Sequence, residues 1–83
     1  MKIELTSVAK KQLKKLPKSE IKKISRKLLS LRSNSFLGKR LKGELQNEYS
    51  LKAWPYRIIY IVPPKKDLVQ IEDIRHRQGV YKK

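Results

Sequence analysis

The spacing of apolar residues changes once along this chain, and that change constrains the fold more than any other feature. In the first half, apolar side chains recur every three or four positions, as they do on one face of a helix. In the second half they alternate with polar residues and are rich in β-branched and aromatic types. A loop rich in Ser, Asn and Gly at residues 33–38 separates the two patterns. The order predicts an α+β fold.

The first half is predicted to hold a short strand and two helices. Residues 3–5 alternate in polarity, which favours a strand. Thr6 or Ser7 can accept a backbone N–H and begin a helix that Pro17 ends, and Ser19 is the expected N-cap of a second helix. The apolar stripes of the two helices comprise Val8, Ala9, Leu13 and Leu16 in the first, and Ile21, Ile24, Leu28 and Leu31 in the second.

The second half is predicted to form a sheet. Strands are expected at 48–53, 56–62 and 68–74, with a Pro-rich turn at 63–67 that makes the last two an antiparallel hairpin. We therefore expect an N-terminal strand and a two-helix hairpin packed on one face of an antiparallel sheet of about three to four strands. The opposite face is left for function, and residues 75–83 are expected to lie beside the sheet as a tail.

Length and residue types restrict the class of protein. Eighty-three residues can close one hydrophobic core, so residues 1–83 are expected to be a single domain. The chain contains no cysteine, which excludes disulfides and thiolate nucleophiles and fits a cytoplasmic location. No apolar stretch approaches the roughly 18 residues of a spanning helix, so no membrane partner is expected.

The charge points to a polyanionic partner. The chain has 22 Lys and Arg against 7 Asp and Glu, a formal net charge of +15, and the cations are spread along its length. Such an excess of one charge destabilises a compact protein, because the like charges repel one another. A nucleic acid is the expected partner.

The residue types near the C-terminus suit the cleavage of RNA. That reaction needs a proton taken from a 2′-hydroxyl, charge stabilisation of the phosphorane and a proton given to the departing 5′-oxygen. The planar guanidinium groups of Arg57 and Arg75 match phosphate oxygens, although either side chain could equally be a solvated arginine. His76 and Tyr81 can transfer protons; alternatively His76 is an ordinary surface histidine and Tyr81 anchors the tail.

A basic and aromatic grouping suits single-stranded RNA. Trp54 lies between two predicted strands, beside Lys52 and Arg57; the alternative is that its indole closes the core. The carboxylates show no metal-ligand spacing and only one histidine is available, so neither a metal nor another cofactor is expected.

Several short motifs, read together in order, resemble those of the RelE/ParE toxin superfamily, and in particular its RelE branch. They cover nearly the whole chain: an L-x-G step at 41–43, a Tyr-Arg-Ile-Ile-Tyr strand at 56–60 and a basic His-Arg-x-x-Val-Tyr ending at 76–81. Each motif is weak alone, and their order is the more specific signal. The resemblance implies a RelE-like fold.

The resemblance also implies site residues. Lys52 matches a strand lysine that acts in proton transfer or charge stabilisation. Arg57 matches the arginine that holds the scissile phosphate, and Arg75 matches an arginine that stabilises the transition state. Tyr81 matches a C-terminal tyrosine that stacks on the nucleotide, and His76 lies at a position where some relatives carry an acid or base. Other expected RNA contacts are Arg40, Lys42, Trp54, Arg77, Lys82 and Lys83.

The function implied by the resemblance is that of a type II toxin. RelE-like toxins cut messenger RNA in the ribosomal A site, and an antitoxin blocks them. The expected partners are therefore ribosome, mRNA and an acidic antitoxin, for which Ile59 and Ile61 could offer an apolar groove. Two alternatives remain: the ParE branch shares the fold but poisons DNA gyrase, and a non-catalytic relative would only bind RNA. Ser50 occupies a position where some RelE proteins carry another catalytic lysine.

Overall fold

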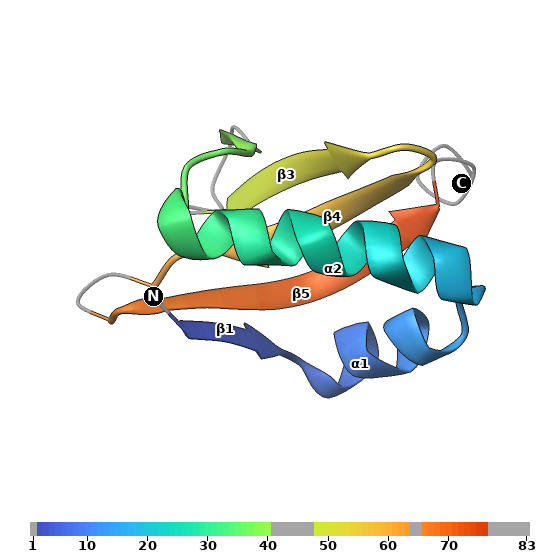
Figure 1. Cartoon of the computed structure of the whole chain (residues 1–83). Helices are drawn as coiled ribbons and strands as arrows, with labels where there is room; N and C mark the ends of the chain where they lie inside the picture. The colour runs from blue at the N-terminus through green and yellow to red at the C-terminus, as the bar shows by residue number, and fades with distance from the viewer. Residues whose placement is uncertain (1, 41–47, 64–65, 77–83) are drawn as a thin grey trace, which may run out of the picture.

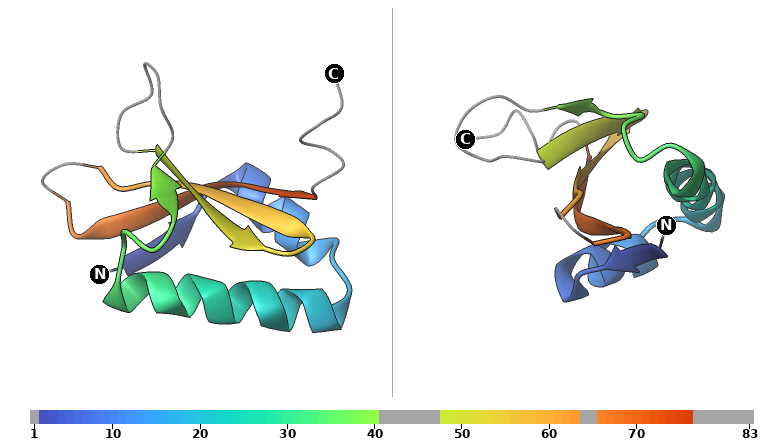
Figure 2. Two further views of the ribbon diagram at one scale, coloured as in Figure 1. Left: turned by 90° about the horizontal axis from the view of Figure 1, so that it is seen from above. Right: turned by 90° about the vertical axis from the view of Figure 1, so that its left-hand side faces the viewer.

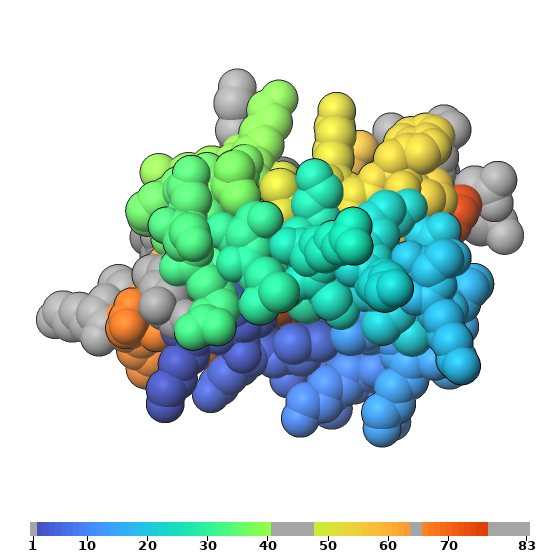
Figure 3. All heavy atoms as spheres, viewed as in Figure 1, coloured from blue at the N-terminus to red at the C-terminus, as the bar shows by residue number. Residues whose placement is uncertain are grey.

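The computed structural model describes residues 2–40, 48–63 and 66–76 and has an α+β fold, as predicted. Two helices cover one face of a sheet, and none of the described residues covers the other, which we call the open face (Figures 1 and 2). Figure 3 shows the covered side of the molecule. The elements are β1 (Lys2–Leu5), α1 (Ser7–Lys14), α2 (Lys18–Ser33), β2 (Lys39–Arg40), β3 (Glu48–Ala53), β4 (Tyr56–Ile61) and β5 (Leu68–His76).

The sheet is larger than predicted and is mixed. Its five strands lie in the order β1-β5-β4-β3-β2, where about three to four antiparallel strands were expected. The β4–β5 hairpin and the β3–β4 pair are antiparallel as predicted, whereas β1 pairs with β5 in parallel. A parallel pair needs a long connection between its strands, and nearly the whole chain connects these two. The pattern of β1 alone gave no indication of its partner.

The helix boundaries show which capping predictions hold. Thr6 is the N-cap of α1, where its Oγ1 accepts a hydrogen bond from the Ala9 N–H at 3.2 Å. The prediction of Ser19 as the second N-cap was wrong, because Pro17 takes the N-cap position of α2 and the helix begins at Lys18. Pro is favourable near a helix start because it lacks the N–H that would have no helical partner there.

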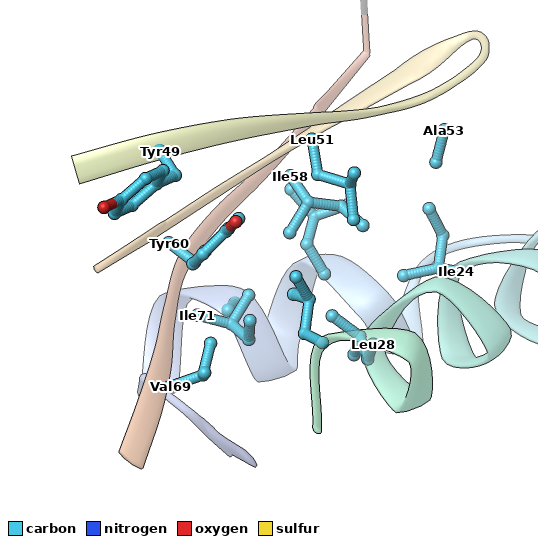
Figure 4. Close-up of a cluster of buried hydrophobic side chains, with 12 residues drawn as sticks. Ile24, Leu28, Tyr49, Leu51, Ala53, Ile58, Tyr60, Val69 and Ile71 are labelled. Carbon is cyan, nitrogen blue, oxygen red and sulfur yellow. The ribbon is translucent and has the colours of Figure 1, made fainter. Parts of the chain in front are cut away.

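The core lies between the helices and the sheet (Figure 4). Alternate residues of the strands, such as Leu51, Ile58 and Ile71, point toward the buried residues of α2. The predicted stripe of the first helix is only partly buried, since the Val8 side chain is 56% exposed. The buried members are Ala9, Ile24, Leu28, Leu31, Tyr49, Leu51, Ala53, Ile58, Tyr60, Val69, Ile71 and Ile74.

Tyr60 fixes the loop that leads from α2 to β2. Its buried hydroxyl donates to the Ser35 carbonyl and accepts from the Gly38 N–H, both at 2.9 Å. A Cβ at Gly38 would come within 2.8 Å of this hydroxyl and 3.0 Å of the Ser50 carbonyl, so no larger side chain fits without a shift. These contacts hold the loop at Ser35 and Gly38, directly before β2.

Burial raises the pKa of Tyr60 above its ordinary value near 10, an effect that outweighs the lowering by the hydrogen bond from Gly38. The folded state then keeps this proton at a pH where the unfolded chain has lost it, so the free energy of unfolding falls as pH rises past about 10. Urea titrations between about pH 8 and pH 11 should show this loss beyond that of a Tyr60→Phe variant, which removes the titrating group. Equal losses in both proteins would contradict the assignment.

The last strand extends further than predicted. Strand β5 ends at His76, so Arg75 and His76 belong to the sheet and not to a tail. A register shift beside Ile59 and Tyr60 keeps Ile74 on the buried side beyond the irregularity. The remainder of the predicted tail, residues 77–83, lies outside the described residues.

Candidate functional site

Three cationic residues from three strands lie side by side across the sheet. In the register of the sheet, Lys52 of β3 is the partner of Arg57 of β4, and Arg57 is the partner of Arg75 of β5. Neighbouring strands are about 4.8 Å apart, so the backbones of the outer two are about 10 Å from each other. We call these three residues the cationic row.

The cationic row is on the open face of the sheet. Leu51, Ile58 and Ile74 precede or follow its members and are buried under the helices. Because successive side chains of a strand point to opposite faces, Lys52, Arg57 and Arg75 point away from the helices. Residues that are far apart in sequence are thus brought to one exposed surface.

An acidic and an amide side chain orient Arg75. The Arg75 Nε donates to Asp73 Oδ2, and Asp73 Oδ1 accepts from the Gln12 side-chain amide. Gln12 also accepts the Ile74 N–H through its Oε1 at 2.6 Å, which ties α1 to the free edge of β5. The Asp73 side chain is 18% exposed and that of Arg75 is 53% exposed, so the less exposed partner holds the more exposed one.

Among the described residues, few carboxylates neutralise the cationic row. Two unit charges 4 Å apart repel by about 1 kcal/mol in water and more near a protein surface. Asp73 is the one carboxylate that forms an ion pair with a member of the row within the described part of the chain. An arrangement that concentrates like charge in this way costs stability and attracts a polyanion.

A cleft of about 730 Å³ continues the cationic row toward β2. It is bordered by Lys52 and Arg57 on one side and by Lys39 and Arg40 on the other, with Ser50 on its floor. Arg40, a predicted RNA contact, lines this cleft with Lys52 and Arg57, while its register partner Tyr49 is buried and its strand position therefore faces the helices. A phosphodiester placed here would meet cations on two sides. These cations would stabilise the negative charge that develops on the phosphate oxygens during cleavage.

His76 lies on the other face of the sheet. His76 comes two residues after the buried Ile74, so both side chains point to the face that the helices cover. Its ring meets the Tyr56 ring edge-on, with the centroids 5.3 Å apart. The Lys23 ammonium lies 5.9 Å from the Tyr56 ring centroid on the side of α2. The structure therefore does not bring His76 together with the cationic row.

Trp54 is exposed at the turn between β3 and β4, where the Trp54–Pro55 peptide bond is cis. Its side chain is 66% exposed, so the alternative that it closes the core was wrong. Ile59 and Ile61 are half-buried and share the open face with Arg57, which is where the sequence placed a groove for an antitoxin. The predicted residues Lys42, Arg77, Tyr81, Lys82 and Lys83 lie outside the described residues.

Two residues that bear on the site were missed by the sequence analysis. Asp73 was considered only among the carboxylates that show no metal-ligand spacing, and Gln12 was not considered. The signal was present: Gln12 is an uncharged polar residue among the lysines of α1, on the half-buried side of that helix. Its bonding partners are 61 and 62 positions away, which no local pattern reveals.

Across residues 2–40, 48–63 and 66–76, no group of three His, Cys, Asp or Glu side chains is placed to hold a metal ion. None of the helices in these segments has the length and apolarity that crossing a bilayer requires.

Comparison with known proteins identifies relatives of this chain. Residues 3–81 match the family described as ParE toxin of type II toxin-antitoxin system, parDE. No curated protein sequence matched. Among solved structures, the RelBE2 toxin–antitoxin complex from Mycobacterium tuberculosis is similar with a TM-score of 0.82 and 26% identity, over 92% of this chain and 96% of that one.

Two further structures share the fold. The isolated RelE toxin of E. coli has a TM-score of 0.81 and 20% identity, over 90% of this chain and 82% of that one. The YoeB dimer of Staphylococcus aureus has a TM-score of 0.74 and 25% identity, over 92% of this chain and 95% of that one. The predicted RelE-like fold is therefore confirmed.

Proposed function

Since this chain belongs to the ParE toxin family of type II toxin-antitoxin systems, within the RelE/ParE superfamily, we propose that it is a toxin that cuts messenger RNA. The observation that carries the proposal is the cationic row, which presents Lys52, Arg57 and Arg75 on the open face beside a basic cleft. Three cations in adjacent register suit the binding of a phosphodiester, because each can contact or neutralise a phosphate oxygen. Inhibition of another protein does not depend on such an arrangement.

The proposed reaction needs no metal ion. The 2′-oxygen attacks phosphorus, the bond from phosphorus to the 5′-oxygen breaks, and the products are a 2′,3′-cyclic phosphate and a 5′-hydroxyl. Arg57, in the middle of the row, would hold two phosphate oxygens with its planar fork, and Arg75 would stabilise the charge that develops on the phosphorane.

Protons must move at both oxygens. Lys52 is proposed to supply a proton, or a compensating charge, to the departing 5′-oxygen. Tyr81 is proposed to stack on the nucleotide and assist proton transfer, and Lys42, Arg77, Lys82 and Lys83 to contact the RNA backbone. His76 takes part only if the RNA wraps the edge of the sheet, because it is on the opposite face.

The proposed partners follow from the same surface. The chain would act in the cytoplasm on mRNA in the ribosomal A site. An acidic antitoxin would neutralise the cationic row and cover the half-buried pair Ile59 and Ile61.

Mapping RNA ends after induced expression tests the proposed function. We expect translation to stop and messages to be cut within codons, leaving 2′,3′-cyclic phosphate ends. An Arg75→Ala, Tyr81→Phe double variant should leave messages intact and restore growth. Growth arrest with intact messages would contradict the proposal.

A second candidate function is inhibition of DNA gyrase, and one observation favours it: the family that matches residues 3–81 is that of ParE toxins. Expression would then produce DNA breaks and cleavage complexes with gyrase. The Arg75→Ala, Tyr81→Phe double variant would then remain toxic, because inhibition of gyrase would not depend on RNA cleavage.

A further inference from the structure

The most exposed large hydrophobic side chain in the described part of the chain belongs to Trp54. With 66% of its surface accessible, the indole forgoes most of the stabilisation that burial of an aromatic ring provides. Trp54 is also the one tryptophan of the whole sequence. A large aromatic ring held in solvent next to a functional surface suggests that a ligand covers it.

The backbone that carries Trp54 is tethered to α2. The Lys23 Nζ donates a hydrogen bond to the Trp54 carbonyl and also pairs with Glu20 Oε1 at 2.7 Å. The same ammonium lies 5.9 Å from the Tyr56 ring centroid, just past the turn. Because the turn is already held, a ligand that binds the indole does not have to pay for ordering the backbone.

Trp54 stands close to the cationic row. It comes two residues after Lys52 and three before Arg57, and those two are direct partners in the sheet. Two residues of extended chain span at most about 7 Å, so the Trp54 backbone lies within roughly that distance of the Lys52 backbone. Cations that track a phosphate backbone and an aromatic ring within one nucleotide's reach are the combination that binds single-stranded nucleic acid.

We propose that Trp54 is a stacking platform for a base of single-stranded RNA whose neighbouring phosphate lies on the cationic row. The inference rests on the proposed function for the choice of RNA and adds to it a residue that positions the substrate. An acidic protein partner fits the charge equally and can also bury a tryptophan, but its carboxylates carry no flat ring at a fixed distance, whereas every nucleotide presents a flat ring next to its phosphate.

The fluorescence of Trp54 tests this directly, since no other tryptophan contributes. We expect quenching of wild-type protein by a short single-stranded 2′-O-methyl RNA, which cannot be cleaved because its 2′-oxygen is blocked. An abasic strand of the same length carries the phosphates without the rings and should cause much less quenching when bound to the same extent.

Binding of the same RNA should weaken by about 5- to 100-fold in Trp54→Ala and be largely kept in Trp54→Phe. The matched control is Leu29→Ala, which removes a side chain of similar exposure, 59%, from α2 and should change the affinity less than about twofold. Far-ultraviolet circular dichroism confirms that each variant is folded.

The outcomes separate this inference from the proposed function. Absence of quenching while RNA is bound, equal quenching by the abasic strand, or quenching by an acidic peptide but not by RNA would each overturn the inference. RNA-specific quenching in a protein that fails to cut messages supports the inference and removes only the proposed chemistry. Normal cleavage by Trp54→Ala with unchanged RNA affinity removes only the inference.

Discussion

Replacing Arg57 with alanine is expected to lower the rate of RNA cleavage by about a hundredfold to a thousandfold. Arg57 is the middle member of the cationic row, with Lys52 on one side and Arg75 on the other. A donor aimed at the charge that develops in the transition state contributes most where its position is fixed in advance, and the paired strands fix this one. Cleavage of a defined message on purified translating ribosomes measures the loss.

An Arg57→Lys variant separates charge from geometry. Lysine keeps the positive charge but not the planar pair of donors, so we expect a loss intermediate between wild type and Arg57→Ala. Arg26→Ala is the matched control, because it removes the same group from the exposed surface of α2. The cleavage rate of Arg26→Ala should stay within about threefold of wild type. Any change would come only from the smaller net positive charge, which attracts RNA less strongly.

The stability of Arg57→Ala distinguishes lost chemistry from lost structure. Removing the central charge relieves repulsion from its two neighbours, so the midpoint of thermal unfolding should stay the same or rise. Cleavage within about threefold of wild type would remove Arg57 from the mechanism. A fall in both stability and rate would instead show that Arg57 serves the fold.

Replacing Tyr60 with phenylalanine is expected to lower the free energy of unfolding by about 2–4 kcal/mol. The hydroxyl bonds both the Ser35 carbonyl and the Gly38 N–H, and each group loses its partner when the oxygen is removed. A domain of this size has a total stability of roughly 4–12 kcal/mol, so the loss is a large fraction. Urea unfolding followed by circular dichroism measures it.

Tyr49→Phe is the control for Tyr60→Phe. Tyr49 is also buried and its ring stacks on that of Tyr60 with centroids 5.3 Å apart. Within the described residues its hydroxyl makes no hydrogen bond that compares with those of Tyr60, so we expect a loss below about 0.5 kcal/mol. Equal losses in the two variants would show that packing, and not the hydroxyl, explains the effect.

The Tyr60 hydroxyl also affects the site, since the loop it holds carries Lys39 and Arg40 to the cleft. In Tyr60→Phe, RNA affinity should therefore fall even under conditions where the protein is fully folded. The effect on RNA binding separates this local role from global stability.

The sequence alone determined the class of fold and most of its elements. Apolar residues at helical spacing indicated both helices, and alternation located β3, β4 and β5 to within two residues. These signals are local, because a period of 3.6 or 2 is visible within a few turns or residues. The motif resemblance also pointed to the superfamily that the comparisons confirm.

Only the tertiary structure decided the pairing of strands and therefore the composition of the site. The parallel pairing of β1 with β5 joins residues about 66 positions apart, and the two-residue strand β2 follows a loop that Tyr60 holds from 22 and 25 positions away. Register placed Lys52, Arg57 and Arg75 in one row and turned His76 to the opposite face. Which strand lies beside which depends on contacts between distant residues, and a period read along the chain carries no information about them.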